Sequence, residues 1–190
     1  MTTGLKIPLR AINESVIRDL KEKYPDAEIS VELHHDRQKG PLSEAGFWEI
    51  ISLLDWSKEG DDEAITEPAV SRLAAGSVRH IIEFADMLSE KLYALDGLDY
   101  ASHIGEGSWS PDQYFSVDHF LYARCCVIAN GAGIFEEVLK NPDKMPRDCT
   151  FEALLYIPSE AYQRKTGRKY AYTPAFSFET FSNQAGWASL

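Results

Sequence analysis

The stretch SVDHFLYARCCVIANG, residues 116–131, decides most of the fold. Ser116 is a favourable N-cap and Asn130-Gly131 is a typical helix stop, so the stretch predicts one helix between these positions. The face of this helix is broadly apolar, yet Arg124 stands in the middle of it. An unpaired buried guanidinium costs on the order of several kcal/mol, so Arg124 must reach water or meet a carboxylate. The thirty acidic residues of the chain supply such partners.

The composition predicts a folded, acidic protein. Hydrophobic residues make up 44% of the 190 residues and aromatic residues 12%, which argues against global disorder. The formal net charge is -11, from 19 basic and 30 acidic residues. This balance argues against binding to nucleic acid or to an anionic membrane, because both rely on Lys and Arg. It is compatible with the attraction of a basic partner.

The cysteines and the apolar runs predict a cytoplasmic protein. Cys125 and Cys126 are neighbours on the expected helix, where successive side chains point about 100° apart, so they would not pair without distortion. We therefore expect all three cysteines to be reduced thiols. The first residues lack the pattern of a signal peptide, and no apolar run approaches the roughly 18 to 20 residues that span a bilayer.

Residues 1–38 predict a small β-α-β appendage. Residues 5–11 and 27–34 are the two expected strands, and a helix that begins at Asn13 and closes at Pro25 joins them. Two strands alone are marginal in water, so this element is expected to use a helix surface or a third strand. Residues 170–181 of the aromatic tail, 169–190, which we expect to pack on this element, could supply that strand. Without that strand, pairing across a homodimer is the alternative.

Residues 42–168 predict a helical body of about six helices, so the fold class is mainly α with the N-terminal element making it α+β overall. Residues 97–115 form the one long loop, and Pro158 should kink or split the last helix. Pro68 is tolerable only near the first turn of its helix. The expected helices are 43–56, one through Val70 and Leu73 that ends at Gly76, 77–96, 116–129, one through Phe135 and Leu139, and 150–167.

Metal and cofactor sites are not expected. The histidines show no metal-ligand spacing, since the adjacent pair His34-His35 would point to opposite faces of a strand. There is no nucleophile motif and no glycine-rich nucleotide loop. The acidic run at 59–67 lacks the spacing of a calcium loop and is better explained as a solvated turn that precedes a helix.

Polar residues on the apolar stripes are the candidate site. Asp86, Glu90 and Tyr93 share one face of the 77–96 helix, where Arg124 could meet them. One interpretation is an ion pair of Arg124 with Glu90 or Asp86 that fixes helix register. The other is a pocket that binds or hydrolyses a small substrate. The candidate pocket comprises Trp48, Asp55, Trp56, Asp86, Glu90, Tyr93, Asp118, Tyr122 and Arg124.

Four runs of sequence resemble the bacterial domain-of-unknown-function family 4240, over about residues 42–167. Residues 97–100 replace a more polar run, and Pro158 interrupts the last helix. The resemblance implies a small cytoplasmic helical protein, similar to domains that occur as immunity or regulatory proteins, and it carries over no activity. The runs are FWEIISLLDWSKEGDDEAITEPAV (47–70), FADMLSEKLYALD (84–96), YFSVDHFLYARCCVIANG (114–131) and MPRDCTFEALLYIPSEAYQRKTG (145–167).

Two functions remain open at this point. The first is an acidic binding or regulatory module, of the type of an immunity protein that inhibits a basic partner protein, with aromatic side chains of the loop 97–115 and of the tail as anchors. The second is a small-molecule-binding domain or small hydrolase that uses the carboxylate and arginine pocket. We favour the first, because no nucleophile–base or metal pattern supports an enzyme.

Overall fold

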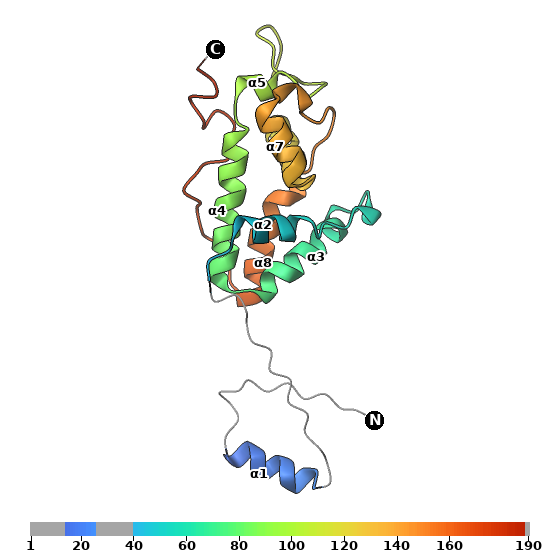
Figure 1. The fold of residues 1–190 in the computed structure, drawn as a ribbon, viewed down its shortest axis with the longest axis vertical. Coiled ribbons are helices and arrows are strands. Elements are labelled where there is room, and N and C mark those ends of the chain that lie inside the picture. The colour runs from blue at the N-terminus through green and yellow to red at the C-terminus, as the bar shows by residue number, and fades with distance from the viewer. Residues whose placement is uncertain (1–13, 26–39, 189–190) are drawn as a thin grey trace. The chain divides into compact units, whose positions relative to one another are not determined.

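The computed structural model describes residues 14–25 and 40–188, and within these ranges the protein is helical with no strand (Figure 1). The chain divides into two units, Met1–His35 and Asp36–Leu190. The α+β class expected from the sequence is therefore wrong for the described residues. In particular, residues 170–181 form no strand, because their backbone groups bond to the helical body instead of to a sheet.

In the first unit the structure describes one helix, α1 (Glu14–Lys23), which matches the helix of the expected β-α-β element. Glu14 lies in its first turn and Lys21 and Lys23 in its last, an arrangement that suits the helix macrodipole. The two strands expected at 5–11 and 27–34 lie outside the described residues.

Serine caps set the helix starts of the second unit. Ser43, Ser77 and Ser116 each accept a hydrogen bond from the backbone N–H three residues further on. The described elements are α2 (Glu44–Ile51), η2 (Trp56–Lys58), α3 (Asp62–Ala75), α4 (Val78–Ala94), α5 (Leu98–Ala101), α6 (Val117–Ala129), α7 (Ala132–Lys140), η3 (Pro142–Lys144), η4 (Glu152–Tyr156) and α8 (Ile157–Thr166), where η marks a 3₁₀ helix.

The helix α6 lies at the centre of the core. All of its residues from Phe120 to Ala129 are buried except Tyr122, so the helix is covered on nearly every side. The helix α4 packs against both α6 and α8, and α3 packs on α8. Arg124 is thus placed in the interior by the apolar residues before and after it on α6.

The prolines shape two helices. Pro158 lies in the first turn of α8, where it splits the expected 150–167 helix into η4 and α8, so the split is confirmed. Pro68 lies inside α3, which begins at Asp62, and not near the first turn as expected. The loop 97–115 contains the short helix α5, and the Trp109 N–H donates to the Ala101 carbonyl at 2.8 Å.

The cysteines differ from expectation. Cys126 on α6 and Cys149, 23 residues later, form a disulfide with a Cα–Cα distance of 6.2 Å, and Cys125 is free and buried. The expectation of three reduced thiols is therefore wrong, and the argument for a cytoplasm that rested on it is lost. The sequence excluded only the adjacent pair, because the approach of Cys149 depends on how the chain after α7 returns to α6.

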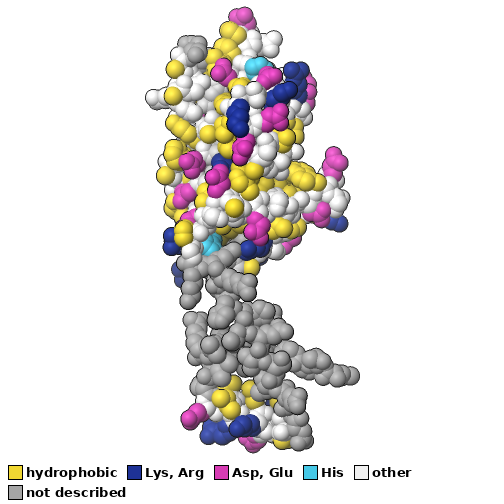
Figure 2. All heavy atoms as spheres, viewed as in Figure 1, with side chains coloured by type: hydrophobic (Ala, Val, Ile, Leu, Met, Phe, Trp, Pro, Cys, Tyr) yellow, Lys and Arg dark blue, Asp and Glu magenta, His cyan; other side chains and the backbone are white. Residues whose placement is uncertain are grey.

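Acidic side chains are spread over the visible face of the second unit, between patches of apolar side chains (Figure 2). Within the residues that the structure describes, no helix is both long and apolar enough to cross a membrane.

Candidate functional site

Arg124 is fully buried and bonds mainly to oxygens of the peptide chain. Its Nη1 donates to the Leu92 carbonyl at 2.8 Å, and its Nη2 donates to the Phe178 carbonyl and to the Thr180 hydroxyl, both at 3.0 Å. Burial lowers the pKa of Arg124 to about 10, so the guanidinium stays protonated at neutral pH. Its guanidinium carbon also lies 4.7 Å from the centre of the Phe120 ring.

The carboxylate partner of Arg124 is Asp96, rather than Asp86 or Glu90. Both side chains are 0% exposed, and Arg124 Nη1 lies 4.0 Å from Asp96 Oδ1. Asp96 also accepts hydrogen bonds from four tail groups. The donors are the Phe181 N–H, the Ser182 hydroxyl, the Asn183 N–H and the Trp187 Nε1–H.

The tail segment 177–188 is therefore part of the helical unit. Trp187 is buried, and its ring packs against those of Phe120 and Phe181. Gly186 lies so close to the chain at Asp96 that a Cβ there would come within 2.3 Å of the Asp96 carbonyl. The pair Arg124–Asp96 thus holds the tail against α4 and α6. Its hydrogen-bonding groups are occupied by these structural contacts.

Two of the three candidate residues on α4 have partners in the tail. Asp86 accepts hydrogen bonds from the Tyr172 hydroxyl at 2.8 and 3.0 Å, and the Tyr93 ring stacks on Phe176 at 5.1 Å. Glu90 is exposed. The face of α4 that carries Asp86, Glu90 and Tyr93 therefore mostly contacts the tail. Arg124 lies on another side of α4, where it donates to the Leu92 carbonyl.

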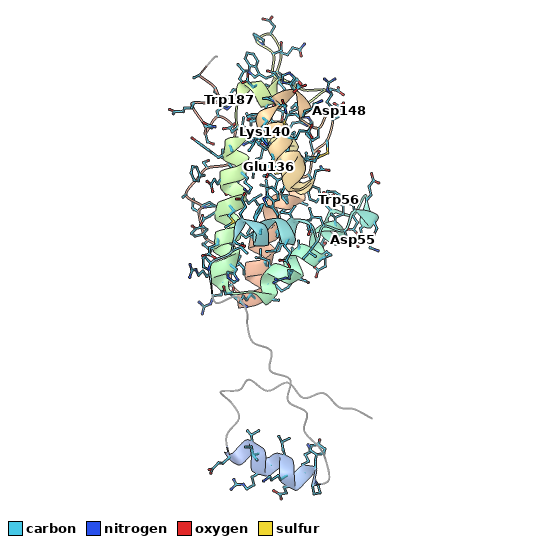
Figure 3. The ribbon with its side chains drawn as sticks, viewed as in Figure 1. Asp55, Trp56, Glu136, Lys140, Asp148 and Trp187 are labelled. Carbon is cyan, nitrogen blue, oxygen red and sulfur yellow. A yellow bond between two sulfur atoms is a disulfide. The ribbon has the colours of Figure 1, made fainter. Side chains whose placement is uncertain are left out.

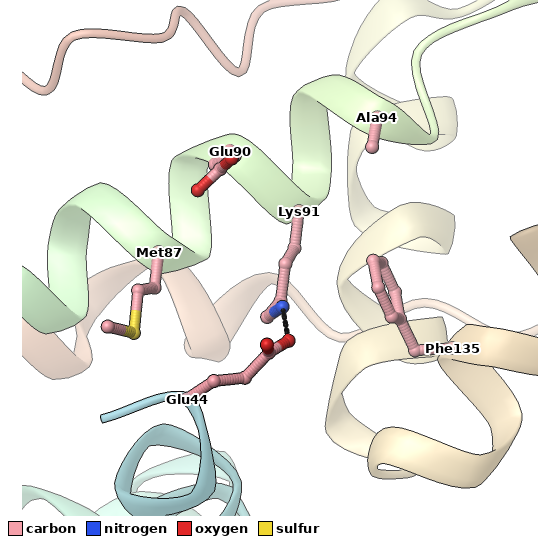
Figure 4. A pocket seen from close by; sticks show the side chains of 6 residues that line it. All are labelled: Glu44, Met87, Glu90, Lys91, Ala94 and Phe135. Atoms are coloured by element: carbon pink, nitrogen blue, oxygen red, sulfur yellow. Dashed lines mark hydrogen bonds and ion pairs between the residues drawn. The ribbon is translucent and has the colours of Figure 1, made fainter. Parts of the chain in front are cut away.

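Glu90 lines a cavity of about 270 Å³ beside Lys91 (Figure 4). The Lys91 ammonium is paired with the Glu44 carboxylate and lies 5.0 Å from the ring centres of both Trp48 and Phe135. The Lys91 side chain is 12% exposed, whereas that of Glu44 is 68% exposed. The lining is completed by three side chains of mixed character: Met87, Ala94 and Phe135.

A second cavity, of about 210 Å³, is the more distinctive site, because four carboxylates meet in it and none of its lining residues is basic. We call it the acidic groove. The start of α3, η4 and α8 supply its walls. Its lining residues are Asp62, Glu63, Thr66, Glu152, Ala153, Tyr156 and Glu160.

The carboxylates of the acidic groove differ in their surroundings. Tyr156 donates a short hydrogen bond to Glu152, and hydrogen bonding to the same carboxylate raises the pKa of Tyr122 to about 12. Burial, with the nearby charge of Glu63, raises the pKa of Glu160. Two tyrosines therefore converge on Glu152, while Glu160 keeps its charge less readily than an ordinary glutamate.

Exposed aromatic rings flank the acidic groove. Trp56 is 47% exposed and stacks on Phe151, the residue before Glu152, at 5.0 Å. Tyr156 is 49% exposed. Asp55 accepts from the Ser57 N–H and hydroxyl and thereby caps the turn that carries Trp56 (Figure 3). The candidate residues Trp56 and Tyr122 thus contact residues of the η4 side of this groove, Asp55 caps the turn that carries Trp56, and Asp118 is exposed at the start of α6.

Sequence reasoning missed the acidic groove, because its carboxylates come from two distant runs. The run at 59–67 by itself predicts a solvated turn, and Glu152 and Glu160 match no site motif. The one signal in the sequence is that these two glutamates lie near the aromatic residues Phe151 and Tyr156. Among the described side chains, no group of three or more His, Cys, Asp or Glu is arranged to hold a metal ion.

The geometry defines a small helical domain with a polar anchor for its tail and an acidic, aromatic-edged groove. Residues 42–164 match the family model described as a protein of unknown function, DUF4240, and the chain belongs to this family. No curated protein and no solved structure matches it. The family match ends before the tail segment 177–188, although that segment satisfies the buried pair inside the domain.

Proposed function

We propose that this domain is a binding module for a basic partner protein, and that the acidic groove receives an arginine or lysine side chain of that partner. The observation that carries the proposal is the meeting of four carboxylates in one cavity without a basic lining residue. Trp56 and Tyr156 add exposed ring faces on which a guanidinium can stack. Aromatic anchors around a charged recess are typical of interface hot spots.

The net charge of -11 supports the same proposal, because a strongly acidic protein accelerates its encounter with a basic partner. An immunity-type inhibitor that masks the basic site of a toxin is the form of regulatory module that we propose for this domain. The support for that form is the combination of an acidic recess, exposed aromatic side chains and a compact helical scaffold.

Neutralising the groove tests the proposal. In the full-length chain, Glu63→Gln with Glu160→Gln should weaken binding of a fluorescent octa-arginine peptide about tenfold, because two carboxylates of one recess lose their charge. The affinity would be measured by fluorescence anisotropy at low salt. It should fall as salt is added, because screening weakens charge pairing.

The matched control is Glu136→Gln with Glu137→Gln, two exposed carboxylates on α7 that do not line the acidic groove. It removes the same number of charges and should change the affinity less than about twofold. Lowering the pH should also weaken binding. Glu160 must be ionised to bind a cation, and its raised pKa makes it take up a proton earlier than an ordinary glutamate as the pH falls. Equal losses in the two double variants would refute the groove as the binding site.

The second candidate function is small-molecule binding in the cavity beside Lys91, which the volume of about 270 Å³ favours. A molecule that carries both an anionic and a cationic group fits best, since Lys91 and Glu90 lie in the same lining. A panel of amino acids should then contain members that raise the melting temperature, and Lys91→Met should abolish the rise. No shift with any member of the panel would remove this candidate.

A further inference from the structure

We propose that the Cys126–Cys149 disulfide is a thiol-exchange site that controls the acidic groove, an inference that rests on the proposed function of that groove. The disulfide ties α6 to the segment 141–151, which runs directly into η4. The helix η4 supplies Glu152, Ala153 and Tyr156 to the groove. A covalent link at Cys149 therefore lies three residues from the first groove residue on that wall.

The two sulfur atoms differ in access and in surroundings. Cys126 is 2% exposed, whereas Cys149 is only partly buried, so Cys149 is the half of the disulfide nearer to the surface and the expected point of attack. Asn130 Nδ2 lies 3.6 Å from Cys126 Sγ and donates to it. Attack at Cys149 makes Cys126 the leaving group, and this amide gives the departing Cys126 sulfur one hydrogen-bond donor.

The exchange balances with a dithiol protein or glutathione as the two-electron reductant. A reductant thiolate attacks Cys149 Sγ, the bond between the two protein sulfurs breaks, and Cys126 leaves as a thiolate that takes up a proton. A second thiol of the reductant then attacks the reductant sulfur of the mixed disulfide. This step releases Cys149 as a thiolate and converts the reductant into its disulfide.

Cys125 takes no part in this exchange. It is fully buried on the other side of the helix turn, and burial raises the pKa of its thiol to about 12. The fraction of reactive thiolate at Cys125 is therefore negligible at neutral pH, so the neighbouring thiol does not scramble the disulfide. The protein should present one free thiol when oxidised and three when reduced.

Without the disulfide, noncovalent contacts alone hold the wall of the groove. The Asp148 N–H donates to the Ile104 carbonyl at 2.9 Å, and the Glu106 N–H donates to Asp148 Oδ1 at 2.7 Å. The Phe151 N–H donates to the Tyr122 carbonyl at 3.0 Å. The Glu106–Asp148 contact is exposed, whereas Phe151 and Leu154 are buried in the core, so the exposed part of the segment before Phe151 opens first. Reduction should therefore raise the frequency with which this part opens and loosen the attachment of the Glu152 wall.

Hydrogen exchange of the full-length chain, with and without dithiothreitol, tests the inference. Reduction should speed exchange at the amides of Asp148 and Phe151 at least about tenfold, by a larger factor than in α4, and lower the melting temperature by about 10 °C. Affinity for the octa-arginine peptide should fall about fivefold and return on reoxidation with diamide. Cys126→Ser with Cys149→Ser should show the reduced behaviour under both conditions, and Cys125→Ala should respond like the native chain.

The failure of this inference and the failure of the proposed function give different results. If the oxidised protein does not bind octa-arginine, the groove function fails, whereas the exchange rates still decide whether the disulfide controls the segment. Unchanged exchange at Asp148 and Phe151 after reduction would overturn the switch even if the peptide binds. Three reactive thiols after treatment with diamide would overturn it as well.

Discussion

Arg124→Ala is expected to lower the free energy of unfolding by about 3–5 kcal/mol, because it leaves the buried Asp96 carboxylate without its cation. The change also empties a site in the centre of α6 and deprives two carbonyls, those of Leu92 and Phe178, of their donor. Chemical denaturation followed by fluorescence of the four tryptophans measures the loss.

The matched control is Arg79→Ala. Arg79 pairs with Glu83 on the surface of α4, and its side chain is 63% exposed, so its removal should cost no more than about 0.5 kcal/mol. Arg124→Met with Asp96→Asn should recover part of the loss, since the pair is then replaced and not broken. An Arg124→Ala variant as stable as Arg79→Ala would show that the buried pair has no structural role.

Deletion of residues 177–190 should destabilise the domain by at least about 4 kcal/mol. It removes Trp187 from the core, and it takes away all four tail donors to Asp96 and two acceptors of Arg124. The charges of Arg124 and Asp96 would then lack their tail partners, and the surrounding core offers no water to replace them. Denaturation of the truncated and full-length chains compares the two directly.

A milder variant keeps this prediction testable if the truncated chain does not fold. Gly186→Ala should cost about 1–3 kcal/mol, because its Cβ meets the Asp96 carbonyl at 2.3 Å. Gly133→Ala on α7 is the control: a Cβ there meets nothing within 4 Å, so the change should be neutral or slightly stabilising. Equal stability of the two alanine variants would contradict the close packing of the tail on α4.

Much of the helical unit could be predicted from local sequence. Ser77 and Ser116 cap α4 and α6 as expected, and Pro158 divides η4 from α8. These features follow from backbone chemistry within a few residues. The apolar residues around Arg124 on α6 predicted that its guanidinium would either reach water or meet a carboxylate, and the structure shows it buried beside Asp96.

The partners of Arg124 could not be predicted, because they depend on long-range packing. Asp96 follows the C-cap of α4, so an argument restricted to the faces of that helix favoured Asp86 and Glu90 instead. The backbone carbonyl of Phe178 carries no signature in sequence. The expected strand at 170–181 was wrong for a related reason: alternating aromatic residues there contact helices, and the backbone bonds to side chains and not to a sheet.

The acidic groove depends on an even longer range. Its two acidic runs are separated by α4, α6 and α7 in sequence, and they meet because α3 packs on α8. The disulfide could not be predicted for the same reason, because Cys149 reaches α6 only when the segment after α7 folds back. Charge alone favoured the proposal of a basic partner, whereas the proposed binding groove could be recognised only from the tertiary structure.

The proposal that the acidic groove binds a basic partner is tested most directly by photo-crosslinking in living cells. The crosslinking amino acid p-benzoylphenylalanine would replace Trp56 at the edge of the groove, and in a parallel chain it would replace Tyr114, which is 89% exposed on the loop 97–115. The account predicts a discrete adduct with a basic protein from position 56, lost in the Glu63→Gln, Glu160→Gln background and absent from position 114. No adduct at position 56, or the same adduct from both positions, would contradict it.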